Sequence, residues 1–349
     1  MFQRILVPLD GSSRAEQAIT VAANVARASG GSVVLLRVVT SPADLSRYGL
    51  ESAHALQEAV DADIERATQY LAEIAAWEAL AGISVTTEVL PGDPSLTIFP
   101  VAHAHQADLI IICSHGSTGV RRWGMGSVSQ KVARHSPLPV LILREGAGVP
   151  TNLHPEGVRS VRILVSLDGS PLAETAILPA AYLSTGLSAP APGALHLARV
   201  LPFPADETKP QNEQANEQAA EAKEKALAEA DSYLQNVKQR LLTEDIADLK
   251  LQITTAVGMD TDVADVLIGM AEDGEGMEEV EGFEGCDIIA MATHGRGGLQ
   301  RWVMGSMTER VLSSTKLPLL IIRPQKIEAR NEKTVVTTTE SSTSWVGLL

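Results

Sequence analysis

An internal duplication is the feature that most constrains what this chain can fold into. The segment ILVPLDGSSRAEQAI (5–19) returns as ILVSLDGSPLAETAI (163–177). Downstream, SHGSTGVRRWGMGS (114–127) returns as THGRGGLQRWVMGS (293–306), and SPLPVLILR (136–144) returns as TKLPLLIIR (315–323). Because the three pairs occur in the same order, a whole domain has been duplicated and not a single motif.

The offsets between the copies place the domain boundaries and the insertions. Asp10 and Asp168 are 158 positions apart, whereas Gly116 and Gly295 are 179 apart, so the second copy is 21 residues longer between these points. Polar, glutamate-rich runs near 204–218 and 272–285 account for the difference and are expected to form solvated loops or helix extensions. The sequence therefore predicts two domains, 1–145 and 161–324, a Gly/Pro-rich linker at 146–160 and a flexible tail at 325–349.

Composition and periodicity predict an α/β fold for each domain. Hydrophobic residues make up 45% of the chain but aromatics only 3%, which suits a parallel sheet of Val, Ile and Leu under Ala-rich helices. Short apolar runs alternate with helical patterns, as in parallel sheets with right-handed crossovers. The strands are expected near 3–9, 32–39, 83–90, 108–113 and 138–144, and again near 161–167, 194–200, 249–256, 286–292 and 317–323. In the first copy the helices are expected near 13–29, 55–81, 95–106 and 127–135.

Charge and cysteine content narrow the classes of function. The formal net charge is -15, which argues against nucleic acids and anionic membranes as partners. The two cysteines, Cys113 and Cys286, have no metal-type spacing and are expected to be free thiols. The N-terminus has too short an apolar run for a signal peptide, and no stretch approaches the ~20 apolar residues that span a bilayer. We expect a cytoplasmic protein.

The polar and glycine residues follow the first and fourth strand of each copy. In open doubly wound sheets, ligands bind beyond the carboxyl ends of the strands, where the strand order reverses. At the second of these positions Gly126-Ser127, like Gly305-Ser306, precedes a helix. The amides of Gly126, Ser127 and Val128 are expected to be free at this helix start and to bind phosphate with the helix dipole. Gly305, Ser306 and Met307 repeat the arrangement.

Other polar residues of these loops have competing interpretations. Asp10 and Asp168 are candidates either for contacts to a base edge or for N-caps of the following helix. His115 and His294 are expected to orient the loop by hydrogen bonding and not to act as general bases, because the motif offers no nucleophile or paired acid. His103 and His105 are interpreted as surface or core residues and not as metal ligands.

These motifs resemble the universal stress protein family in its tandem two-domain form. The family pattern is Gly, two residues, Gly, nine residues, then Gly-Ser or Gly-Thr; its later positions match Gly116, Gly126 and Ser127, and in the second copy Gly295, Gly305 and Ser306. The resemblance covers nearly all of 1–145 and 160–324. It implies a five-stranded sheet of order 3-2-1-4-5 in each Rossmann-like domain, ATP in the crevice, and pairing of the domains through their fifth strands.

The resemblance also supplies the other candidate nucleotide-binding positions. The family aspartate matches Asp10 and Asp168, and the adenine-contacting valine matches Val38 and Val200. Pro8, near the end of the expected first strand, is a further candidate for nucleotide binding. The first glycine of the pattern is replaced by Cys113 and by Ala292, so that each copy places a side chain beside the pocket floor.

The sequence predicts an ATP-binding stress-response or regulatory protein that is not a turnover enzyme. Mg²⁺ would bind mainly through the phosphates of the nucleotide, because no carboxylate cluster is present to hold it. Two alternatives remain open at this point: a nucleotide-free scaffold that binds partners, and an enzyme of ATP hydrolysis or nucleotidyl transfer. The apolar fifth strands favour pairing of the two domains within one chain, and both a monomer and a homodimer fit the sequence.

Overall fold

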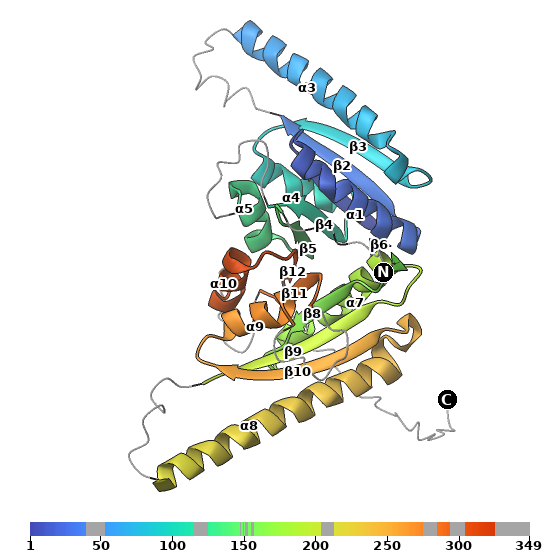
Figure 1. Ribbon diagram of the computed structural model, residues 1–349. Helices are drawn as coiled ribbons and strands as arrows, with labels where there is room; N and C mark the ends of the chain where they lie inside the picture. Colours follow the sequence, from blue (N-terminus) through green and yellow to red (C-terminus); the bar gives the residue numbers. More distant parts are fainter. Residues whose placement is uncertain are drawn as a thin grey trace, which may run out of the picture.

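One continuous sheet runs through the whole molecule. The computed structural model describes residues 1–39, 53–114, 125–146, 148, 150, 153–154, 157–203, 213–274, 285–293 and 304–324. The strand order is β10-β9-β8-β11-β12-β5-β4-β1-β2-β3. Each half is thus a parallel sheet of order 3-2-1-4-5, and the two fifth strands meet in the middle (Figure 1). This confirms the expected fold class.

The strands and helices of each half follow one another as the apolar runs predict. In the first half they are β1 (Arg4–Leu9), α1 (Ser13–Ser29), β2 (Ser32–Val39), α3 (Ala53–Ala75), β3 (Ser84–Pro91), α4 (Pro94–Ala104), β4 (Leu109–Cys113), α5 (Ser127–His135) and β5 (Val140–Leu143). In the second half they are β8 (Arg162–Ser166), α6 (Pro171–Glu174), α7 (Ile177–Ser188), β9 (Ala194–Pro202), α8 (Glu213–Arg240), β10 (Gln252–Asp260), α9 (Val263–Glu272), β11 (Ile288–Ala292), α10 (Ser306–Ser314) and β12 (Leu319–Ile322).

Three local features differ from the expectations. The helix expected at 55–81 ends at Ala75, and a separate 3₁₀ turn follows at Glu78–Leu80. The first helix of the second half is divided into α6 and α7, because Pro179, which stands where the first half has Val21, cannot donate a hydrogen bond to the Thr175 carbonyl. The linker contains a small antiparallel pair, β6 (Leu153–His154) and β7 (Gly157–Val158).

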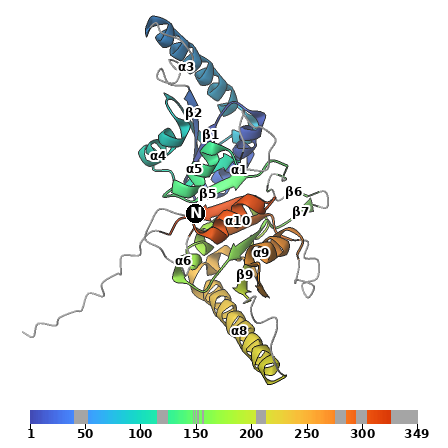
Figure 2. The same cartoon turned by 90° about the vertical axis from the view of Figure 1, so that its left-hand side faces the viewer.

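The described parts of the two insertions belong to helix ends. Residues 213–218 lie in α8, which extends past the sheet at one end of the molecule, as α3 does at the other (Figure 2). Glu272 is the last residue of α9. Residues 204–212 and 275–284 and the tail at 325–349 fall outside the described residues.

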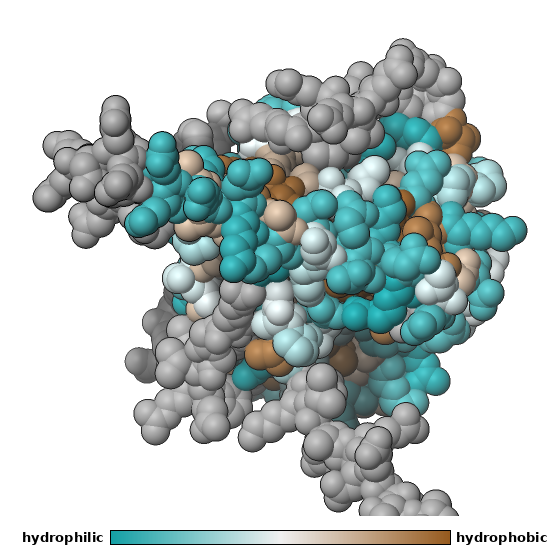
Figure 3. Space-filling view, turned by 90° about the horizontal axis from the view of Figure 1, so that it is seen from below, coloured by the Kyte–Doolittle hydropathy of each residue, from teal (hydrophilic) through white to brown (hydrophobic). Residues whose placement is uncertain are grey.

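The hydrophobic core forms a layer on each face of the sheet. On one face α1, α3, α7 and α8 cover buried side chains of both halves, and on the other face α4, α5, α9 and α10 do so. The two halves share the first layer directly, because α1 packs against α7. The approach is close: a Cβ added at Gly186 of α7 would lie 3.5 Å from the Cα of Val25 in α1. Seen from below, the described surface is mainly hydrophilic with scattered apolar residues (Figure 3).

The seam between the halves is an antiparallel strand pair with reciprocal polar contacts. Leu320 of β12 pairs with Leu141 of β5, and both side chains are fully buried. Arg144 donates to the Leu312 carbonyl in the last turn of α10, and Arg323 donates to the His135 carbonyl at the end of α5 (3.4 Å). The positive charge of an arginine at a helix C-terminus also interacts favourably with the negative end of the helix dipole.

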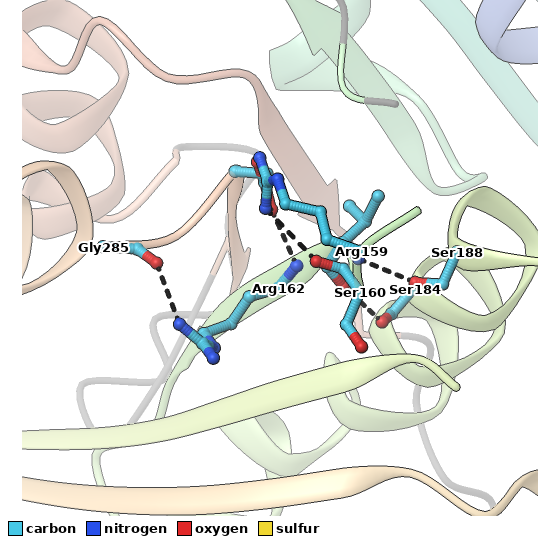
Figure 4. A network of polar contacts seen from close by, with 8 residues as sticks. Arg159, Ser160, Arg162, Ser184, Ser188 and Gly285 are labelled. Carbon is cyan, nitrogen blue, oxygen red and sulfur yellow. Dashed lines mark hydrogen bonds and ion pairs between the residues drawn. The ribbon is translucent and has the colours of Figure 1, made fainter. Parts of the chain in front are cut away.

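The amino ends of the strands are held by an aspartate in each half. Asp287 accepts hydrogen bonds from the Arg162 amide (2.8 Å) and from the Arg159 guanidinium, in the network drawn in Figure 4. Asp108 accepts from the amides of Gln3 (2.7 Å) and Arg4 (3.0 Å) in the same way. These contacts hold the amino-terminal ends of the strands, at the opposite end of the sheet from the carboxyl ends.

Candidate functional site

A crevice opens beyond the carboxyl ends of β1, β2 and β4 in the first half. It encloses about 150 Å³ and lies where the sheet order reverses, which is the usual ligand position in such folds. Seven of the predicted nucleotide-binding residues line it: Pro8, Asp10, Val38, Cys113, Gly126, Ser127 and Val128. His115 and Gly116 lie outside the described residues.

The loop after β1 has a fixed geometry that recurs in the second half. The Asp10 carboxylate accepts hydrogen bonds from the Ser12 amide (3.0 Å) and hydroxyl (2.6 Å), and the Ser12 hydroxyl accepts from the Ala15 amide (3.2 Å). Gly11 has φ +81°, a conformation that L side chains rarely adopt. The interpretation of Asp10 as the N-cap is therefore wrong: Ser12 caps α1, and Asp10 orients Ser12 from the edge of the crevice.

The second half repeats this loop almost without change. Asp168 accepts from the Ser170 amide (2.9 Å) and hydroxyl (2.6 Å), and Ser170 caps α6. Gly169 has φ +83°. The same correction therefore applies to Asp168.

The helix start at α5 forms one wall of the crevice. Gly126 is the N-cap and Ser127 the first helical residue, with an exposed side chain. The Gly126 amide donates to the Ser114 carbonyl (2.7 Å), so it is not free as the sequence suggested. Among the contacts of the described residues, none occupies the amides of Ser127 and Val128. Within the described residues, two of the three expected donors thus have no protein partner.

The start of α10 in the second half has the same construction. The Gly305 amide donates to the Thr293 carbonyl (2.8 Å), and Ser306 is exposed. A Cβ at Gly305 would lie 3.1 Å from the Thr293 oxygen, so glycine allows this close approach. Met307 follows in the first turn, and His294 and Gly295 lie outside the described residues.

Ala292 and Val200 lie at the corresponding strand ends in the second half of the sheet. Ala292 ends β11, and its carbonyl accepts a hydrogen bond from the Thr308 hydroxyl (3.0 Å). Val200 lies near the end of β9 and pairs with Gly258 of the edge strand β10. The second-half candidates are thus placed at the matching strand and helix ends.

Cys113 stands where the family pattern has glycine, and its thiol is turned toward α1. Its Sγ lies 2.9 Å from the Arg14 carbonyl oxygen, to which the thiol donates. Burial raises the pKa of the Cys113 thiol to about 12, and burial raises the pKa of Cys286 to about 12 as well. Cys113 therefore narrows the crevice less than its size suggests, because the sulfur is held against the backbone of α1.

Both thiols are expected to react slowly with thiol reagents in the folded protein. At pH 8 the thiolate population is about a thousandfold smaller for a pKa of about 12 than for the ordinary value of 9.0. The rate of iodoacetamide labelling should rise about tenfold per pH unit from pH 7 to 10, without the plateau of an ordinary thiol. Peptide mass spectrometry after timed labelling, with urea-unfolded protein as the control, measures each cysteine. Fast labelling of Cys113 at pH 7 would contradict the buried, neutral thiol.

Sequence reasoning missed an arginine and a tyrosine near the loop after β1. The Arg37 guanidinium donates to the Leu9 carbonyl (3.2 Å) and lies against Gly11, and Arg37 also lines the crevice. The Tyr70 hydroxyl donates to Glu16 (3.0 Å), and burial raises the pKa of Tyr70.

The second half contains the same pair of residue types. The Arg199 guanidinium lies 4.9 Å from the centre of the Tyr233 ring, and Tyr233 donates to Glu174 (2.8 Å). The sequence does carry a signal for these positions, because Arg precedes Val in both copies of the second strand. The position of the tyrosine is decided by how its helix, α3 in the first half and α8 in the second, packs on the sheet.

The described residues contain neither a metal-binding cluster nor a membrane-spanning helix. No group of three or more His, Cys, Asp or Glu side chains in the described part of the chain could hold a metal ion. His105 lies 2.5 Å from the Glu88 carboxylate, so it belongs to a surface pair. No helix in the described ranges is both long enough and apolar enough to cross a bilayer.

The fold and the site together define a class: a tandem α/β protein with a crevice at the switch point of its first half and matching strand and helix ends in its second half. The family model for the universal stress protein family matches residues 1–144 and again 161–323. The chain therefore belongs to the universal stress protein family, in a tandem form.

Individual relatives agree with the tandem organisation. A universal stress protein of Methanocaldococcus jannaschii is 28% identical over 146 residues, covering 42% of this chain and 84% of the relative. One of Thermus aquaticus is 33% identical over 147 residues, covering 41% of this chain and all (100%) of the relative. A universal stress protein structure from Archaeoglobus fulgidus has a TM-score of 0.58 at 18% identity and covers 92% of this chain and 98% of its own. The last likeness shows that both halves together form a known fold.

Proposed function

We propose that this protein binds an adenine nucleotide, ATP, in the crevice of its first half, and acts as a stress-response or regulatory protein without turnover chemistry. The observation that carries the proposal is the start of α5, where the amides of Ser127 and Val128 have no partner among the described residues and Ser127 is exposed. Two amides at the positive end of a helix dipole bind phosphate oxygens without needing a lysine.

The remaining walls of the crevice suit a purine base and ribose. Leu36, Val38 and Ile98 supply apolar contacts, and Asp10 and Pro8 lie at the end of β1. An apolar slot with a few fixed polar groups is the usual form of a small-molecule site. Mg²⁺ would be held by the phosphates, and we assign it no side-chain ligand.

ATP binding to the full chain is the decisive measurement. Isothermal titration calorimetry should give saturable binding of ATP, with GTP as the comparison nucleotide. Native mass spectrometry of freshly purified protein should show co-purified adenine nucleotide. Equilibrium dialysis with no uptake at millimolar ATP would overturn the proposal and leave a nucleotide-free scaffold. Release of AMP and pyrophosphate in equal amounts, or rapid release of phosphate, would show instead that the protein is an enzyme.

A further inference from the structure

The two helix starts are alike in backbone and unlike in charge. Three residues after Ser127 the first half has Gln130, and at the matching position after Ser306 the second half has Glu309. Glu309 lies in the first turn of α10, which begins with Ser306 and Met307. A carboxylate there competes with any bound anion for the positive end of the helix dipole.

The neighbouring helices enlarge this difference. In the first half, Lys131 of α5 donates to the Ser95 hydroxyl of α4 (3.1 Å). Asp93, the N-cap of α4, has its pKa lowered by the Ser95 hydroxyl and by Lys131, and it matches Asp262, the N-cap of α9, so the extra carboxylate of the second half is Asp265. The matching cation in the second half, Arg310, is paired with Asp262 and lies 3.8 Å from Asp265. The first half has the uncharged Leu96 at the position of Asp265. The segments 115–124 and 294–303 each contain two arginines, so their composition does not offset the difference.

One contact between the halves opposes the extra negative charge. Arg134, in the last turn of α5, forms an ion pair with Glu309 of α10. Both side chains are partly exposed, at 35% and 44%. A residue of the first half therefore offsets part of the negative charge at the second helix start.

We infer that the two halves bind a nucleoside triphosphate unequally: the crevice of the first half takes it, the matching strand and helix ends of the second half disfavour it, and the Arg134–Glu309 pair sets how large the difference is. The inference rests on the proposed function and deepens it. It says which half binds the nucleotide, and it names the contact between the halves that regulates binding to the second half. Arg134 acts as a positioning residue through Glu309 and has no assigned contact with the ligand.

Matched helix-start variants test which crevice binds. Calorimetry of the full chain should give one tight ATP site. Ser127→Asp should remove it, and Ser306→Asp should leave it within about twofold, because each aspartate places a carboxylate at one helix start only. Circular dichroism melts should show both variants folded. Loss of the tight site in Ser306→Asp with its retention in Ser127→Asp would overturn the inference, as would two equal sites in the wild type.

Charge variants at the seam test the role of the ion pair. With the first site blocked by Ser127→Asp, Glu309→Gln should strengthen ATP binding to the second crevice about two- to fivefold, and Arg134→Gln should weaken it by a similar factor. Arg134→Gln should have little effect once Glu309→Gln is present. These effects should shrink between 50 mM and 500 mM NaCl, because exposed charges are screened. An undiminished Arg134→Gln effect in the Glu309→Gln background would refute the regulatory contact, whereas absence of ATP binding to any variant and to the wild type would remove the proposed function itself.

Discussion

Truncation of Leu320 to alanine is expected to lower the free energy of unfolding by about 3 kcal/mol. Leu320 has no exposed surface, and it lies at the antiparallel seam opposite Leu141 and within the core layer shared by both halves. Removal of its side chain leaves a cavity that rigid strands on both sides cannot close. Urea unfolding followed by circular dichroism measures the change.

Leu96→Ala is the matched control for this prediction. Leu96 is 73% exposed on α4, so the same truncation there should cost less than about 0.5 kcal/mol. Equal losses for the two variants would show that the seam is not packed in solution as the structure has it. A Leu320→Ala chain that unfolds in two separate transitions would show in addition that the halves are coupled mainly through this strand pair.

Replacement of Val38 by tryptophan is expected to weaken ATP binding about ten- to hundredfold. Val38 lines the crevice near the end of β2, and the indole would occupy space that a ligand needs. Overfilling a formed site costs about 1–3 kcal/mol, which corresponds to about a five- to 150-fold loss of affinity and brackets this range. Calorimetric titration of ATP measures it, and a thermal melt checks that the variant is folded.

Val200→Trp supplies the control for Val38→Trp at the matching position of the second half. If the first crevice is the one occupied, Val200→Trp should leave the tight ATP site nearly unchanged. An unaltered affinity in folded Val38→Trp would contradict binding in the crevice beside β2. A larger loss from Val200→Trp would place the nucleotide in the second half.

Much of the fold follows from the sequence because its signals are local and are given twice. The apolar runs and the repeated motifs predict the strands of the ten-stranded sheet to within about two residues at either end, as for β1 (Arg4–Leu9) and β4 (Leu109–Cys113). The exception is the edge strand β10 (Gln252–Asp260), which begins about three and ends about four residues later than expected. The expectation of an N-capping Asp10 failed because Asp10 and Ser12 both have a suitable side chain, and only the turn at Gly11 decides which of them reaches the Ala15 amide. The Gly126 amide is another such case, since its partner, the Ser114 carbonyl, lies on the other side of the loop.

The sequence by itself determined the duplication, the parallel α/β halves and the two helix starts with Ser127 and Ser306, because periodicity, glycine spacing and capping act over a few residues. Only the tertiary structure decided that the Cys113 thiol turns toward Arg14, that Arg37 joins the crevice, and that Arg134 reaches Glu309 in the other half. Each of these contacts joins residues far apart in the chain, and their distance and direction are set by how the helices pack on the sheet.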